Sequence, residues 1–97
     1  MRSILLALCL SLAAASASAD TYTVTITTAQ QDADTMARTG VLRHCGRNGG
    51  RREGIGLGST PEQALRNCCY YGRYRIVEKA VAWSPLRRTW FAVIRYE

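Results

Sequence analysis

The sequence predicts a small α+β domain, in which an antiparallel sheet of three or four strands has one or two helices packed on one face. Three observations support this fold class. Runs with strand-like alternation or apolar content stand near both ends of the chain, and two segments with helical spacing lie between them. Once a predicted export signal is removed, the remaining chain is long enough for only one domain.

Residues 1–19 have the pattern of a cleaved secretory signal peptide. A short positive n-region precedes the apolar run Ile4–Leu12, and Ala17–Ala19 places small residues where a signal peptidase reads them. The apolar run is well short of the ~20 residues that cross a bilayer. We therefore expect a secreted or periplasmic protein that consists of residues 20–97 and has no transmembrane span.

The first elements of the domain are a strand and a helix. Residues 22–27 alternate strictly between threonine and a larger side chain, which predicts a strand. Small and apolar residues recur at helical spacing over Ala29–Thr39, and Arg38 near its end suits the helix dipole. Gly40 is a favourable residue to end this helix.

The clearest local signal marks the start of the second helix. Thr60 is a favourable N-cap, Pro61 suits the first helical position, and Gln63 completes a capping box. We expect this helix to run to about Tyr71, because Gly72 then stops it.

A glycine-rich segment, Cys45–Gly58, precedes the second helix. Its first part is expected to be a loop, and Gly54–Gly58 to be a short strand whose glycines allow another backbone to approach closely. A phosphate-binding loop is the alternative. Ser59 stands where that motif requires its third glycine, so the packing role is favoured.

The last third of the domain is predicted to be a hairpin. Tyr74–Trp83 and Trp90–Tyr96 are strand-like, and the residues between them contain a proline and show no periodicity. Trp83 and Trp90 flank the loop and are expected to pair across the strands. The final strand is apolar on both faces, which predicts a central place in the sheet.

The net charge of +6 is concentrated after residue 37, and Lys79 is the only lysine. Arginine suits carboxylate and phosphate ligands because its planar guanidinium binds them bidentately. A purely solubilising role is the alternative. The arginines expected to bind an acidic partner are Arg47, Arg51, Arg52, Arg73, Arg75, Arg87 and Arg88. An acidic protein, a glycan or an envelope component would satisfy them.

The segment Tyr70–Arg75 interleaves tyrosines with arginines, a pattern that suits single-stranded nucleic acid. The alternative is a helix end followed by a strand, with Tyr71 and Tyr74 in the core. Export makes nucleic acid a less expected partner than an envelope polyanion.

Cleavage of the predicted signal peptide would also change the cysteine count, because Cys9 is removed with it and three cysteines remain. A bond from Cys45 to Cys68 or Cys69, with one thiol left over, is the simplest outcome. A bond between the adjacent pair is strained, and an intermolecular bond through the remaining cysteine is also open.

Few residues suggest catalysis. His44 is the only histidine, and with Glu53 and Arg52 it is the available set for general acid–base chemistry. Its neighbour Cys45 points the other way on an extended chain, and the histidine and cysteine spacing does not match a zinc site. We assign no catalytic residue, metal or cofactor. We expect a non-enzymatic exported binding domain, with a small secreted hydrolase or nuclease centred on His44 as the alternative.

Several segments together resemble small exported proteins of unassigned function from planctomycete and environmental phage genomes. The segments that carry this resemblance are 44–50, 53–56, 59–64, 67–69 and 90–96. The resemblance implies that the loop, the capped helix and the hairpin form one recurring unit. It implies no activity and no ligand.

Overall fold

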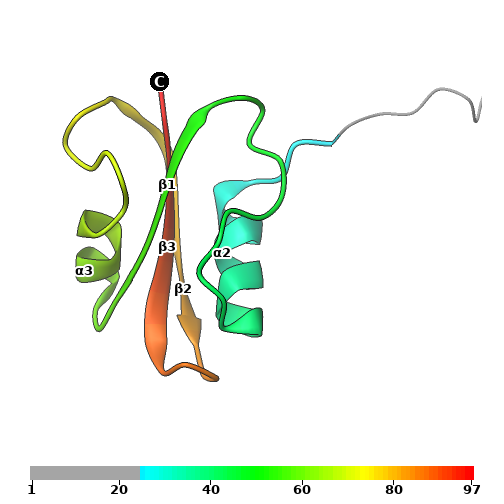
Figure 1. Cartoon of the computed structure of the whole chain (residues 1–97), viewed down its shortest axis with the longest axis vertical. Helices are drawn as coiled ribbons and strands as arrows, with labels where there is room; N and C mark the ends of the chain where they lie inside the picture. The colour runs from blue at the N-terminus through cyan, green and yellow to red at the C-terminus, as the bar shows by residue number, and fades with distance from the viewer. Residues whose placement is uncertain (1–24) are drawn as a thin grey trace, which may run out of the picture.

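A computed structural model describes residues 25–97 (Figure 1). In chain order, its elements are α2 (Ala29–Thr39), β1 (Arg52–Gly58), α3 (Pro61–Arg66), β2 (Ile76–Ser84) and β3 (Thr89–Tyr96). The sheet order is β1-β3-β2, and both pairings are antiparallel. The predicted α+β class and the central place of the last strand are confirmed.

Two sequence-based predictions fall wholly or partly outside the described residues. The predicted signal peptide lies outside them, and so does the first half of the predicted strand 22–27. Residues 25–28 have no regular secondary structure and lead directly into α2. The main chain of Thr27 instead contacts the glycine-rich loop, where its N–H donates to the carbonyl of Arg47 at 2.9 Å.

The sheet carries one helix on each face, whereas the sequence led us to expect the helices on one face (Figure 1). Alternate residues of β3 explain the difference. Phe91 and Val93 belong to the apolar cluster formed with α2, and Ala92 and Ile94 belong to the cluster formed with α3. A central strand that is apolar on both sides needs a cover on both sides, and each helix supplies one.

Helix α2 is built for close approach to the sheet. Its buried face consists of three alanines, Met36 and Asp32, so mostly small side chains separate the helix backbone from the strands. Thr28 caps its start in a capping box with Gln31, and Gly40 ends it with a φ of 73°, as expected for a C-terminal glycine. The predicted bounds of this helix are confirmed.

The glycines of β1 allow α3 and the turn after it to lie directly on the strand. A Cβ atom at Gly54 would stand 2.2 Å from the carbonyl oxygen of Cys69, and one at Gly56 would stand 2.7 Å from that of Ala64. The expectation that these glycines permit close backbone packing is confirmed. The structure extends the strand to Arg52–Gly58.

Helix α3 ends at Arg66, five residues before the predicted end at Tyr71, so that prediction was wrong. The side chain of Asn67 donates to the carbonyl of Leu57 at 2.8 Å and holds the chain against β1. Residues 67–74 then form turns that bring Cys68 into the core. Contacts with the sheet therefore decide where the helix ends.

The hairpin between β2 and β3 has the predicted register. Trp83 pairs with Trp90, and their ring centroids lie 5.6 Å apart in an edge-to-face arrangement. The turn is completed by Arg88, which has a φ of 55°, and by the hydroxyl of Ser84, which accepts from the N–H of Arg87 at 3.1 Å.

The close approach at β1 predicts a large effect of a single methyl group. Gly56→Ala should lower the free energy of unfolding by about 3 kcal/mol, because the backbone atoms of Ala64, Asn67 and Cys68 that the new methyl group would meet cannot move aside cheaply. Gly72→Ala is the control, since its site is open and only the positive φ costs energy, about 1 kcal/mol. Urea denaturation measures both variants. Equal losses would contradict the packing role of Gly56.

Candidate functional site

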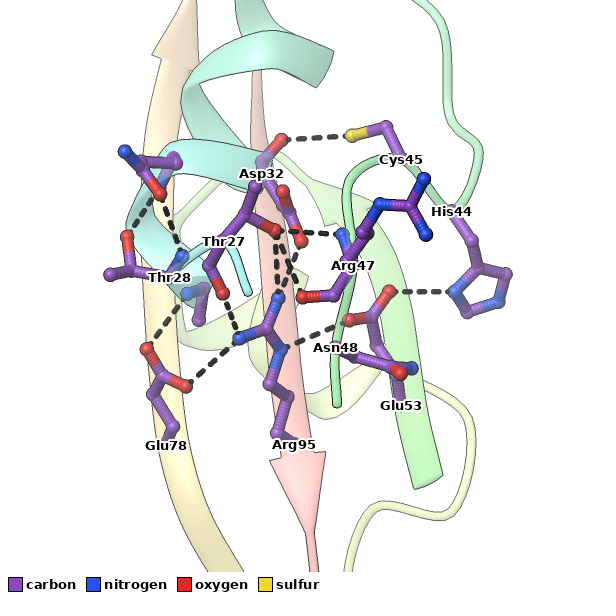
Figure 2. Close-up of polar contacts among 12 residues, drawn as sticks. Thr27, Thr28, Asp32, His44, Cys45, Arg47, Asn48, Glu53, Glu78 and Arg95 are labelled. Atoms are coloured by element: carbon purple, nitrogen blue, oxygen red, sulfur yellow. Dashed lines mark hydrogen bonds and ion pairs between the residues drawn. The ribbon is translucent and has the colours of Figure 1, made fainter. Parts of the chain in front are cut away.

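A buried guanidinium, that of Arg95 on β3, stands at the centre of a polar network on the α2 side of the sheet (Figure 2). The residue is 2% exposed. Its Nε donates to Glu53 at 3.2 Å, and its Nη2 donates to Asp32 at 2.6 Å. Its Nη1 donates to Glu78 at 3.2 Å. The strand register places Glu53 and Glu78 on either side of Arg95, so the sheet itself builds two of these contacts.

The electrostatic environment keeps Arg95 charged. Burial alone lowers the pKa of a guanidinium, but the hydrogen bond to Glu53 and the three neighbouring carboxylates outweigh it and raise the pKa of Arg95 above its ordinary value. The carbonyl of Thr27 accepts a further bond from Nη1. Among the described residues, no buried side-chain nitrogen or oxygen is left without a hydrogen-bond partner.

The network joins four separate parts of the chain. Asp32 lies on α2, Glu53 on β1, Glu78 on β2 and Thr27 before α2. The second oxygen of Glu78 accepts the N–H of Ala29 at 2.7 Å, so the network also satisfies the start of α2. Arg95 therefore holds α2 in place on the sheet.

His44 extends the network to the surface. Its Nδ1 lies 2.8 Å from Glu53, and the two side chains are 60% and 3% exposed. The pair lies at the edge of a cavity of about 590 Å³ formed by the glycine-rich loop, and Arg47 and Asn48 also line it. The N–H of Arg47 donates to the hydroxyl of Thr27 at 2.9 Å, which ties the loop to the network (Figure 2).

Sequence reasoning named His44 and Glu53 as available for catalysis, and the structure brings them together. It places Arg52 elsewhere, because that side chain lies over the rings of Tyr70 and Tyr74. The central residue, Arg95, was not singled out from the sequence. Its only signal is a charge inside the otherwise apolar run of the last strand.

The three cysteines of the described chain are free thiols. Cys45 packs against the α2 cluster and Cys68 belongs to the α3 cluster, so the sheet separates them. Burial raises the pKa of Cys68 to about 12 and also raises the pKa of Cys45, which makes both thiols poor nucleophiles at neutral pH. Cys69 is exposed. The disulfide stays a prediction, and an intermolecular bond through Cys69 would leave the sheet undisturbed.

A second polar region lies at the end of the sheet where β1 and β2 begin and β3 ends. The guanidinium carbon of Arg52 lies 4.2 Å from the centroid of the Tyr74 ring and 5.4 Å from that of Tyr70. These two rings contact each other and Tyr96 edge to face. We call Arg52, Tyr70, Tyr71, Arg73 and Tyr74 the sheet-end surface.

The predicted binding arginines fall into three groups. Arg51, Arg52, Arg73 and Arg75 lie at or next to the sheet-end surface, and Arg75 is paired there with Glu97. Arg47 lines the cavity beside His44. Arg87 and Arg88 lie in the hairpin turn at the other end of the strands, where Arg87 donates to the carbonyl of Gly40 at 2.7 Å. The seven arginines do not form one surface.

Comparison with known proteins adds no relative. No protein-family model, curated protein or solved structure matches this chain. Residues 25–97 contain no helix long and apolar enough to cross a membrane, and no cluster of acidic, histidine and cysteine side chains placed to hold a metal ion.

The buried network predicts that two arginine-to-alanine substitutions have very different effects. Arg95→Ala leaves buried carboxylates without their counter-charge and should lower the free energy of unfolding by about 3–5 kcal/mol. Arg75→Ala breaks an exposed pair and should cost less than about 1 kcal/mol. Chemical denaturation compares the two proteins. A loss for Arg95→Ala no greater than that for Arg75→Ala would show that the network does not stabilise the fold.

Proposed function

We propose that the protein binds a polyanionic partner through the sheet-end surface. The observation that carries this proposal is the environment of the Arg52 side chain. Its side chain is exposed, two tyrosine rings hold its guanidinium, and no carboxylate within residues 25–97 lies at ion-pair distance from it. Its hydrogen-bond donors therefore remain available for an external anion.

Preorganisation makes Arg52 a better ligand-binding group than an ordinary surface arginine. A free arginine side chain loses much rotational freedom when it binds, and that loss weakens binding. The contacts with Tyr70 and Tyr74 restrict Arg52 beforehand. Its planar fork then suits the paired oxygens of a phosphate, sulfate or carboxylate.

The surroundings add to the attraction for anions. Arg73 belongs to the sheet-end surface, Arg51 directly precedes Arg52, and both are exposed. The chain as a whole has a net charge of +6. Clustered positive charge raises the rate and strength of binding to polyanions at low salt. Since residues 1–19 predict export, the partner is expected outside the cytoplasm, among glycans, envelope polymers or released nucleic acid.

The proposal predicts unequal effects of two matched charge reversals. Arg52→Glu should weaken binding to polyphosphate or heparin about tenfold or more at low salt, because it replaces the held guanidinium with a like charge. Arg88→Glu makes the same change of net charge at the hairpin turn and should weaken binding much less. Fluorescence anisotropy with labelled polyanions measures both.

Two outcomes of this comparison would overturn the proposal. Equal effects of the two reversals would show that net charge alone drives binding. Affinity that stays constant between low and high ionic strength would show that the contact is not electrostatic.

A second candidate, a hydrolase acting on phosphodiesters, is favoured by the 2.8 Å contact between His44 and Glu53. Donation from Nδ1 to Glu53 leaves Nε2 of the neutral ring free to accept a proton. In such a reaction, water attacks phosphorus while Nε2 takes its proton, and the bond to the leaving oxygen breaks as that oxygen gains a proton from solvent. Arg47 lines the same cavity and would hold the anionic phosphate.

The test of this second candidate is hydrolysis of RNA and of bis(p-nitrophenyl) phosphate by the purified protein. We expect His44→Ala to abolish turnover and Glu53→Gln to lower kcat, with circular dichroism confirming that both variants fold. Absence of turnover by the unmodified protein, or full turnover by His44→Ala, would exclude the hydrolase.

A further inference from the structure

We infer that the polyanion bound at the sheet-end surface is a single-stranded nucleic acid, whose bases stack on the exposed tyrosine rings. This inference rests on the proposed function and names its ligand. The rings of Tyr70, Tyr71 and Tyr74 belong to residues that are 40%, 46% and 40% exposed. Such exposure of three neighbouring aromatic residues costs free energy in water unless a ligand covers them.

The backbone at one of these tyrosines is strained. Tyr70 has a φ of 68°, a conformation that is unfavourable for a bulky residue. The turn retains it through the N–H of Arg73, which donates to the carbonyl of Tyr70 at 2.9 Å. A glycine would adopt the same turn without strain, so the ring itself is the feature that the strain supports.

The orientation of the rings is specified by the protein rather than left to solvent. The hydroxyl of Tyr96 donates to the carbonyl of Cys69 at 2.8 Å and anchors the turn to β3. The ring of Tyr70 lies edge to face against Tyr96 and Tyr74, with centroids 6.0 Å and 5.6 Å away. Tyr70 and Tyr74 therefore form one packed platform with Tyr96.

Nucleobases fit this platform better than sugars or inorganic polyphosphate do. Bases in single strands stack on tyrosine rings and on arginine guanidinium planes, while neighbouring arginines bind the phosphates. The sheet-end surface brings both kinds of group together, because Arg52 already lies over Tyr74. A sulfated glycan or a polyphosphate would use the arginines, and the strained Tyr70 would then hold Arg52 without contacting the ligand through its own ring.

The experiment compares ligands that carry the same phosphates with and without bases. The purified protein is titrated with an oligothymidine, with an abasic oligonucleotide of the same length, with the corresponding duplex, and with polyphosphate. Stacking contributes about 1–3 kcal/mol per base, so the oligothymidine should bind about tenfold or more tightly than the abasic strand. The duplex, whose bases are already stacked on each other, should bind like the abasic strand.

Two matched variants separate ring stacking from charge. Tyr71→Ala should weaken binding of the oligothymidine several-fold and leave binding of polyphosphate unchanged. Trp83→Ala removes a residue that is also 46% exposed, but at the hairpin end of the sheet, and should change neither affinity. Thermal unfolding checks that both variants remain folded.

The possible results distinguish this inference from the proposed function. Equal affinity for the oligothymidine, the abasic strand and polyphosphate, lowered by Arg52→Glu, would overturn the nucleic-acid ligand and retain polyanion binding. Tighter binding of heparin than of the oligothymidine would assign the surface to glycans. Failure of every polyanion to bind at low salt would overturn both.

Discussion

The buried charge of Arg95 is the constraint on which the arrangement of the other elements depends. A guanidinium that is 2% exposed is tolerated only when acceptors satisfy its donors and balance its charge. Those acceptors come from α2, β1 and β2, so each of these elements must lie where its carboxylate reaches the guanidinium of Arg95. The apolar clusters supply most of the burial, and the network selects which arrangement of helix and strands is compatible with it.

The same constraint divides the polar chemistry of the molecule into two regions. On the α2 side, carboxylates balance the positive charge of Arg95, and His44 continues the network into the cavity of the glycine-rich loop. At the sheet end, Arg52 has aromatic neighbours in place of a carboxylate. Arg95, whose charge the carboxylates balance, therefore serves the structure. Arg52, which the tyrosines hold, is the arginine that we assign to ligand binding.

Local signals in the sequence predicted most of the secondary structure. The capping residues of α3, the glycine after α2 and the tryptophans of the hairpin act on their immediate neighbours, so short patterns identify them. The end of α3 was predicted wrongly because Gly72 was the only local signal for a helix end. The helix ends earlier, where Asn67 contacts β1, and that contact leaves no local pattern in the sequence. The capping box of α2, formed by Thr28 and Gln31, was not recognised from the sequence, because the threonine alternation before it resembles a strand.

The candidate sites were less accessible to sequence reasoning. Arg95 contacts acidic residues 42 and 63 positions away, and no local pattern links them. Sequence reasoning also assigned seven arginines to the binding of one acidic partner, since nothing local shows that the hairpin turn lies at the opposite end of the sheet from the first residue of β1. The alternation of tyrosine and arginine is visible in the sequence. The strained backbone of Tyr70 and the stacking of Arg52 can be recognised only in the folded structure.

The most direct test of this account is the exchange rate of the Nε proton of Arg95, measured by nitrogen-edited NMR at neutral pH. A guanidinium that is charged, buried and bonded to Glu53 should give a resolved, slowly exchanging Nε–H signal. The exposed Arg75 side chain provides the internal reference, and its Nε–H should exchange rapidly with water. If the Arg95 proton exchanged as fast as that of Arg75, Arg95 would not be the buried centre that orders α2 on the sheet.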